Sequence, residues 1–153
     1  MIQRIQSIYI LLAAVMLAGF LFFPIAELDN IKFQIFELKL TKTLLIKDQP
    51  FIILYSKILN IIIRIILGEI ILSIFLFKVR ITQLKLCVLN IILLLILNVV
   101  VLYFLQYYKF ESGFRISFKL PFMFPLAGAI FLYLAIRGIR KDENLVKSYD
   151  RLR

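Results

Sequence analysis

Four long apolar runs dominate this sequence and decide what it can fold into. We expect them to cross a membrane as helices over residues 5–25, 51–77, 86–108 and 121–139. At about 1.5 Å of rise per residue, the first run covers about 32 Å, and a hydrocarbon core is about 30 Å thick. Apolar residues make up 63% of the chain, whereas a soluble domain is roughly half apolar. The sequence therefore predicts an all-α membrane protein, a four-helix transmembrane bundle in one domain.

The first run, residues 5–25, is expected to remain in the protein as a span. A cleaved signal peptide is the alternative, but its apolar region is about 7–15 residues long and ends at a small-residue cleavage site. This run is longer, and it continues into FPIAEL, which is a poor cleavage site. We therefore expect an uncleaved first helix.

The positive charges indicate how the chain is oriented. Four crossings put the N-terminus, residues 78–85 and the C-terminal segment on one side, where ten Lys and Arg residues lie, against seven in the two opposite connections. Basic residues near the ends of spans favour the cytoplasmic side. We expect a multi-pass protein of the bacterial inner membrane with both termini and the tail, residues 140–153, in the cytoplasm. We therefore attribute the net charge of +10 to the orientation of the chain in the membrane, and we expect no nucleic-acid partner.

The tail also carries a pattern of its own. Leu145, Tyr149 and Leu152 recur at i, i+4 and i+7, which gives a helix a narrow apolar stripe. We expect the tail to continue the fourth span as a helix through about Leu145. Its last turns, which include Arg151 and Arg153, are candidates for contact with a partner protein or the lipid surface. A simple topology anchor is the alternative.

Two of the connections contain strand-like patterns. Residues 114–120 alternate between apolar and polar side chains, and residues 31–40 alternate with one slip of phase. Alternation of this kind is typical of a half-buried strand. Both segments lie on the extracytoplasmic side, where they favour a short two-stranded β element over the mouth of the bundle. Two irregular loops in contact with lipid head groups are the alternative.

Four polar residues within the spans are candidates for function, since charge at mid-bilayer costs at least about 2.5–3.5 kcal/mol. They are Arg64 and Glu69 in the second span and Asn90 and Asn98 in the third. Five residues separate Arg64 from Glu69, about 140° around a helix, so the two cannot pair well within it. Glu69 has two interpretations, a proton-carrying carboxyl or a group that holds helices or a partner in register. The asparagine amides are suited to hydrogen bonds across helices.

Small residues mark one point of close helix packing. The fourth span contains Ala127, Gly128 and Ala129 in succession. Small residues allow two helix backbones to approach closely within a membrane. We expect a helix crossing here.

The absence of histidine excludes several kinds of chemistry. The chain has no His and one Cys, Cys87. A His-ligated haem, a His-containing zinc site and a Ser-His-Asp triad are therefore excluded. A lone Cys87 forms no internal disulfide and runs no dithiol relay. We predict no catalytic residues, no metal site, no cofactor and no enzymatic activity.

Three stretches of the chain carry a resemblance to a known family. The start MIQRIQSIYILLAA, the middle FLFKVRITQLKLCVLNIILLLIL and the end IRKDENLVKSYDRLR together resemble an uncharacterised family of small four-span inner-membrane proteins from Bacteroidetes, classed as a domain of unknown function. The resemblance covers essentially the whole chain. Its best marker is the ending, where a block of residues matches: Lys141, Asp142, Glu143, Leu145, Val146, Asp150, Arg151 and Arg153. It implies the topology and supplies no activity, cofactor or partner.

These patterns together favour an interaction role. We predict an accessory subunit or assembly partner of a larger membrane complex, whose partners are the lipid bilayer and other inner-membrane proteins. The alternative is a small oligomeric transporter or channel that uses Arg64 and Glu69. Both residues lie outside the pattern of the resembled family, which disfavours a mechanism shared with it.

Overall fold

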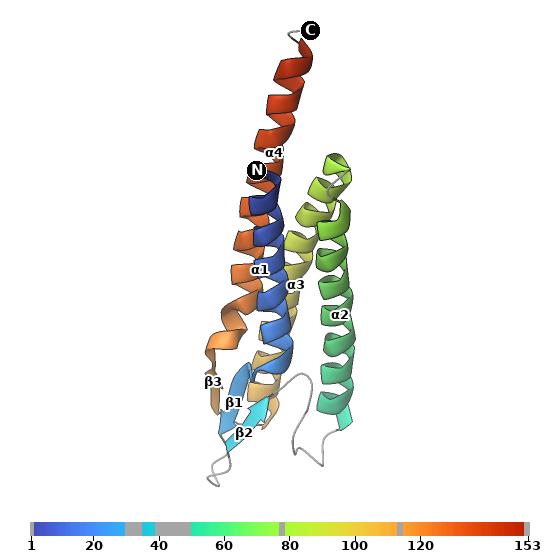
Figure 1. The fold of residues 1–153 in the computed structure, drawn as a ribbon. Helices are drawn as coiled ribbons and strands as arrows, with labels where there is room; N and C mark the ends of the chain where they lie inside the picture. The colour runs from blue at the N-terminus through green and yellow to red at the C-terminus, as the bar shows by residue number, and fades with distance from the viewer. Residues whose placement is uncertain (1, 30–34, 39–49, 77–78, 113–114, 152–153) are drawn as a thin grey trace.

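The chain forms four long helices and a small sheet in the computed structural model (Figure 1). The structure describes residues 2–29, 35–38, 50–76, 79–112 and 115–151. The elements of the bundle are α1 Ile2–Phe22, α2 Pro50–Phe75, α3 Arg80–Ser112, a 3₁₀ turn η2 Leu120–Met123, and α4 Phe124–Arg151. All four α-helices contain a segment long and apolar enough to cross a membrane. The predicted four-helix membrane fold is confirmed.

The helix ends differ from the expected limits of the spans, and each difference has a local cause. α1 ends at Phe22 because Pro24 follows, and the residue before a proline avoids the helical conformation. α3 begins at Arg80, six residues before the expected Leu86, because hydropathy marks the hydrocarbon limits and not the helix limits. α4 runs on to Arg151, beyond the expected Leu145.

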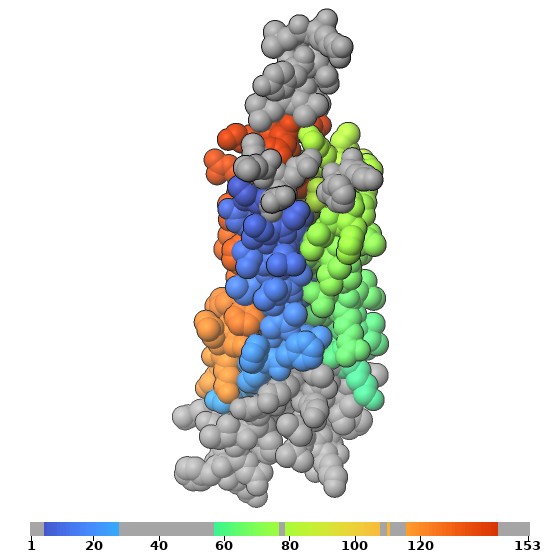
Figure 2. All heavy atoms as spheres, in the orientation of Figure 1, coloured from blue at the N-terminus to red at the C-terminus, as the bar shows by residue number. Residues whose placement is uncertain are grey.

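Each helix packs against two neighbours in a closed ring. α1 packs against α2 and α4, α3 packs against the same two helices, and the contact of α1 with α4 is the most extensive. Figure 2 shows α1 running up the middle of one face, with α4 on the left and the α2–α3 side on the right. The start of α1, the α2–α3 connection and the end of α4 lie at one end of the bundle, and the sheet lies at the other (Figure 1). This is the arrangement expected of four successive crossings.

The sheet has three strands, β1 Ala26–Asp29, β2 Ile35–Leu38 and β3 Arg115–Phe118. Its order is β2-β1-β3, and both pairings are antiparallel. The predicted β element is therefore present, with β2 and β3 inside the two predicted segments. The difference is that these two strands do not pair with each other, because β1, which was not predicted, lies between them.

Most buried residues of α2 and α3 follow a coiled-coil spacing. They recur at alternating steps of three and four residues, which places a narrow apolar seam toward the neighbouring helices. The other faces of these helices are covered with exposed Ile, Leu and Phe, as suits helices surrounded by lipid. The seam consists of Leu59, Ile63, Ile66, Ile70 and Ser73 in α2, and of Gln83, Cys87, Asn90, Leu94, Leu97, Val101 and Phe104 in α3. Asn98 and Leu105 of α3 are also buried, each directly after a seam position.

Small residues bring α1 and α4 close together. A Cβ added at Gly128 would lie 3.6 Å from the carbonyl oxygen of Ala13 and 3.5 Å from Cδ1 of Leu94. A Cβ added at Gly19 would lie only 2.8 Å from the ring of Phe124. The close crossing expected from the small residues around Gly128 is therefore present, and its partner is α1.

Candidate functional site

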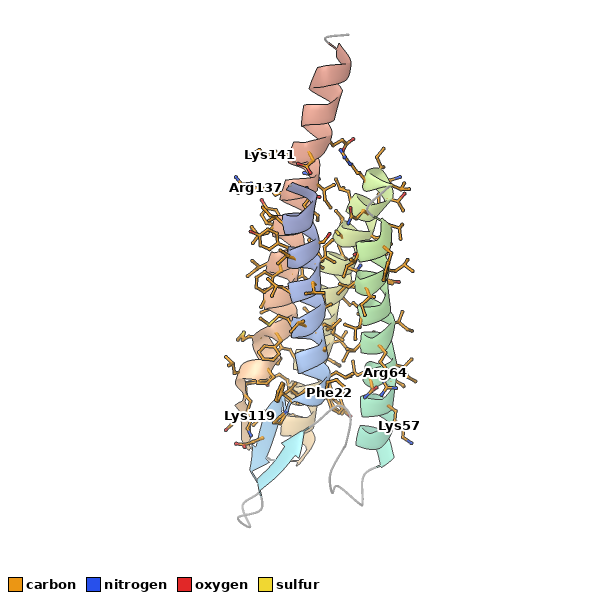
Figure 3. All side chains as sticks on the ribbon, in the orientation of Figure 1. Phe22, Lys57, Arg64, Lys119, Arg137 and Lys141 are labelled. Atoms are coloured by element: carbon orange, nitrogen blue, oxygen red, sulfur yellow. The ribbon has the colours of Figure 1, made fainter. Side chains whose placement is uncertain are left out.

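Arg64 lies on the outside of the bundle. It is exposed on α2, and Figure 3 places it toward the sheet end of that helix, near the level of Phe22 at the end of α1. Lys57 lies two turns nearer to the sheet end (Figure 3). Among the described residues Arg64 has no hydrogen-bond or ion-pair partner. A guanidinium thus faces outward within an apolar helix.

Glu69 lies on a different face of the same helix. It is half-buried, and its Oε2 is buried with no hydrogen-bond partner among the described residues. Glu69 forms no ion pair with Arg64 there, as the 140° of helix between them predicts. The structure therefore does not bring the two ionisable candidates of α2 together.

The two asparagines of α3 are buried, but neither forms the expected bond to another helix within the described part of the chain. The Asn90 amide Nδ2 donates to the carbonyl oxygen of Leu86, 3.0 Å away on the preceding turn of its own helix. The Asn90 Oδ1 and the Asn98 Nδ2 are buried without a partner there. A buried polar group left without a hydrogen bond costs about 1–3 kcal/mol, and a role of the two asparagines in linking helices stays a prediction.

A polar link between α2 and α3 comes instead from residues that were not predicted. The Gln83 Nε2 donates to the main-chain carbonyl oxygen of Ser73 across 3.1 Å, and the Ser73 hydroxyl donates to the carbonyl oxygen of Ile70. Gln83 was assigned to the connection between spans, yet it is buried. The signal that identifies it is the seven-residue step from Gln83 to Asn90, which places both on one seam.

A second polar link joins α1 to α4 at the end that holds the N-terminus. The Gln6 Nε2 donates to the Asp142 carboxylate across 2.6 Å. Gly138 makes room for this contact, because a Cβ there would lie 2.9 Å from Cγ of Gln6. No local pattern could reveal the pair, since 136 residues separate its members. Gln6 and Gln83 therefore fix helix positions near the same end of the bundle.

The sheet end is fastened by a third contact. The Lys119 ammonium pairs with the Glu27 carboxylate, and the Lys119 main-chain N–H donates to the carbonyl oxygen of Ile25 across 3.0 Å. These bonds connect the start of β1 to the segment between β3 and α4. They hold the sheet-side ends of α1 and α4 together.

The end opposite the sheet carries five described basic side chains, on α3 and α4. Arg80 is half-exposed and the others are exposed: Lys85, Arg137, Arg140 and Lys141. The helix of the tail continues through Leu145, Tyr149 and Arg151, but the described side chains end at Glu143. Leu152 and Arg153 lie outside the described residues altogether. The predicted tail contacts therefore remain predictions.

The chemistry-bearing side chains do not converge on one point. The described residues contain no group of three or more His, Cys, Asp or Glu side chains placed to hold a metal ion. Gln6, Ser73 and Gln83 are used to join helices, while Arg64 and Glu69 point away from each other. The arrangement suits packing and association within a membrane.

Comparison with known proteins identifies a family. The family described as Domain of unknown function (DUF4293) matches residues 2–152. This confirms the resemblance to a domain-of-unknown-function family. No curated protein and no solved structure matches the chain.

Proposed function

The chain belongs to the domain-of-unknown-function family DUF4293, and we propose that it is a non-enzymatic accessory subunit or assembly partner of a larger membrane complex. The observation that carries this proposal is the exposure of Arg64 on the outside of α2, inside an apolar span. A charge in lipid costs at least about 2.5–3.5 kcal/mol at mid-helix and less toward a helix end, and Arg64 lies toward the sheet end of α2. A partner that supplies the opposite charge removes part of that cost.

The second candidate function is a small oligomeric transporter or channel. The buried and unpartnered Oε2 of Glu69 favours it, because a buried carboxyl is the usual proton carrier in a membrane. A relay also needs a second titratable group within reach, and Arg64 lies on another face. The accessory role is therefore the better supported of the two.

The proposed complex lies in the bacterial inner membrane with both termini in the cytoplasm. The proposal is supported by the excess of Lys and Arg at the end that holds the termini, which includes Arg80, Lys85, Arg137, Arg140 and Lys141. Basic residues directly after a span resist translocation. The sheet then lies on the extracytoplasmic side.

Purification from native membranes tests the accessory role. The full chain is extracted in a mild detergent, and the mass and composition of the particle are measured by native mass spectrometry. Stable association with other membrane proteins supports the accessory role. A particle that contains only copies of this chain supports the transporter, and a monomer contradicts both.

A further inference from the structure

The outward face of α2 carries a charged residue, Arg64, one turn away from an exposed glycine, Gly68. Ile61, Arg64, Ile65, Gly68 and Leu72 are all exposed, and their spacing of three, one, three and four residues places them on one side of the helix. The buried seam of α2, which includes Ile63 and Ile70, lies on the opposite side. We call the five exposed residues the α2 outer face.

Gly68 lies at the centre of this face and faces open space. Apart from its own helix backbone, no atom of the described residues lies within 4 Å of the position that a Cβ would take, so none of these residues requires a glycine here. Glycine lowers helix propensity by about 1 kcal/mol relative to alanine. In a membrane helix, a glycine allows a second helix to approach closely. The bulky Ile65 and Leu72 rise on either side of this opening.

The charge of Arg64 determines which kind of helix can pack over Gly68. It lies one turn from Gly68 on the side of the sheet end, where Figure 3 shows it on the outside of the bundle. A guanidinium is positively charged and forms paired hydrogen bonds with a carboxylate. A helix that packs over Gly68 therefore needs an acidic side chain at the level of Arg64.

The same charge argues against a second copy of this chain as the occupant. Two copies in one membrane have the same orientation, so a symmetric pair would be related by an axis along the membrane normal. Packing over Gly68 would then place one Arg64 beside the other, and like charges repel. A lipid phosphate at the sheet-side interface could pair with the charge of Arg64. It would not explain the exposed glycine at position 68, which lies further from that interface.

We infer that the α2 outer face docks a transmembrane helix of a different protein, and that this helix carries Asp or Glu at the level of Arg64. The inference rests on the proposed accessory role and identifies the contact surface for it. The docked helix packs over Gly68 between Ile65 and Leu72, and its carboxylate pairs with the guanidinium.

Photo-crosslinking in native membranes tests this surface in the full chain. A benzoylphenylalanine replaces Ile65, which is 58% exposed, and in a separate variant it replaces Ile96 of α3, a matched control that is 53% exposed. The expected result is a protein adduct from position 65, joined to an apolar span that contains Asp or Glu. Gly68→Leu and Arg64→Gln should each lower its yield about tenfold, or about 1.4 kcal/mol in a binding equilibrium, and Arg64→Lys should lower it less.

The other outcomes contradict either the α2 outer face as the docking surface or the proposed accessory role as a whole. An adduct with a second copy, an adduct with lipid alone, or a protein adduct that neither Gly68→Leu nor Arg64→Gln changes overturns this inference. An adduct from position 96 without one from position 65 also overturns it but leaves the accessory role standing. No protein adduct from either position, together with no co-purified partner, overturns both. Burial of the Cys87 thiol in each variant verifies that the bundle is folded.

Discussion

Replacement of Gly128 by leucine should separate the closest pair of helices. Gly128 of α4 lies against the main chain of α1, where an added Cβ would be 3.6 Å from the Ala13 carbonyl oxygen and 3.5 Å from Cδ1 of Leu94. These are ordinary contact distances, so alanine should fit. Leucine adds three further carbons, and the space they need is occupied by Ala13 and Leu94.

The size of the effect follows from what blocks the new side chain. Overpacking costs about 1–3 kcal/mol, with values near the upper end where neighbours cannot rotate aside. The main-chain atoms of Ala13 cannot do so. Leucine regains somewhat under 1 kcal/mol of helix propensity over glycine. The net loss of about 2 kcal/mol should lower the unfolding midpoint by about 4–8 °C, since 1 kcal/mol corresponds to about 2–4 °C at this chain length.

The single cysteine supplies the assay. Cys87 is fully buried, so a thiol-reactive dye added to the protein in detergent reports unfolding during a heat ramp. Gly68→Leu is the matched control, because no other helix among the described residues comes within 4 Å of a Cβ there, and its midpoint should be unchanged or higher. An unchanged midpoint for Gly128→Leu, or equal losses for the two variants, would refute the packing of α1 on α4.

Three further predictions concern topology, Glu69 and the tail. Reporter fusions at Arg153 and at Arg115 should report opposite sides of the membrane, with Arg153 cytoplasmic, and a cytoplasmic signal from Arg115 would contradict the orientation. Glu69→Gln should leave folding and function intact, because Gln keeps the volume and hydrogen-bonding capacity; loss of function at normal abundance would support the transporter instead. Deletion of residues 148–153 should leave insertion intact, since Arg137 and Arg140 remain beside the last span, but weaken co-purification with partners. Equal recovery of partners with and without these residues would reduce the tail to an anchor.

The long elements of this fold could be predicted because each is encoded locally. A run such as residues 86–108 needs no partner to be recognised as a span. β1 could not be found in this way, because its four residues alternate too briefly to stand out, and its pairing with β3 joins it to a segment far along the chain. The same limit explains why the two predicted strands were expected to pair directly.

The polar residues also divide into those whose positions the local sequence predicts and those whose positions depend on a neighbouring helix. Helical periodicity alone shows that Arg64 and Glu69 lie on separate faces, and the structure agrees. Burial of Gln83 depends on the approach of α2, and the bond from Gln6 to Asp142 depends on the approach of α4. Neither neighbour is visible in the local sequence, so the residues that join the helices were missed.

The extensive contact of α1 with α4 has a consequence for how the protein is made. The two helices are joined at one end by Gln6 and Asp142 and at the other by the pairing of β1 with β3, yet α2 and α3 lie between them along the chain. A ribosome therefore delivers α1 to the membrane long before its main partner exists. During that interval the small residues of α1 that pack against α4 have no partner helix. The ring of four helices closes only after α4 has been inserted. The most extensive helix contact of this protein therefore forms only after synthesis of α4, later than the contacts of α2 with α1 and α3 can form.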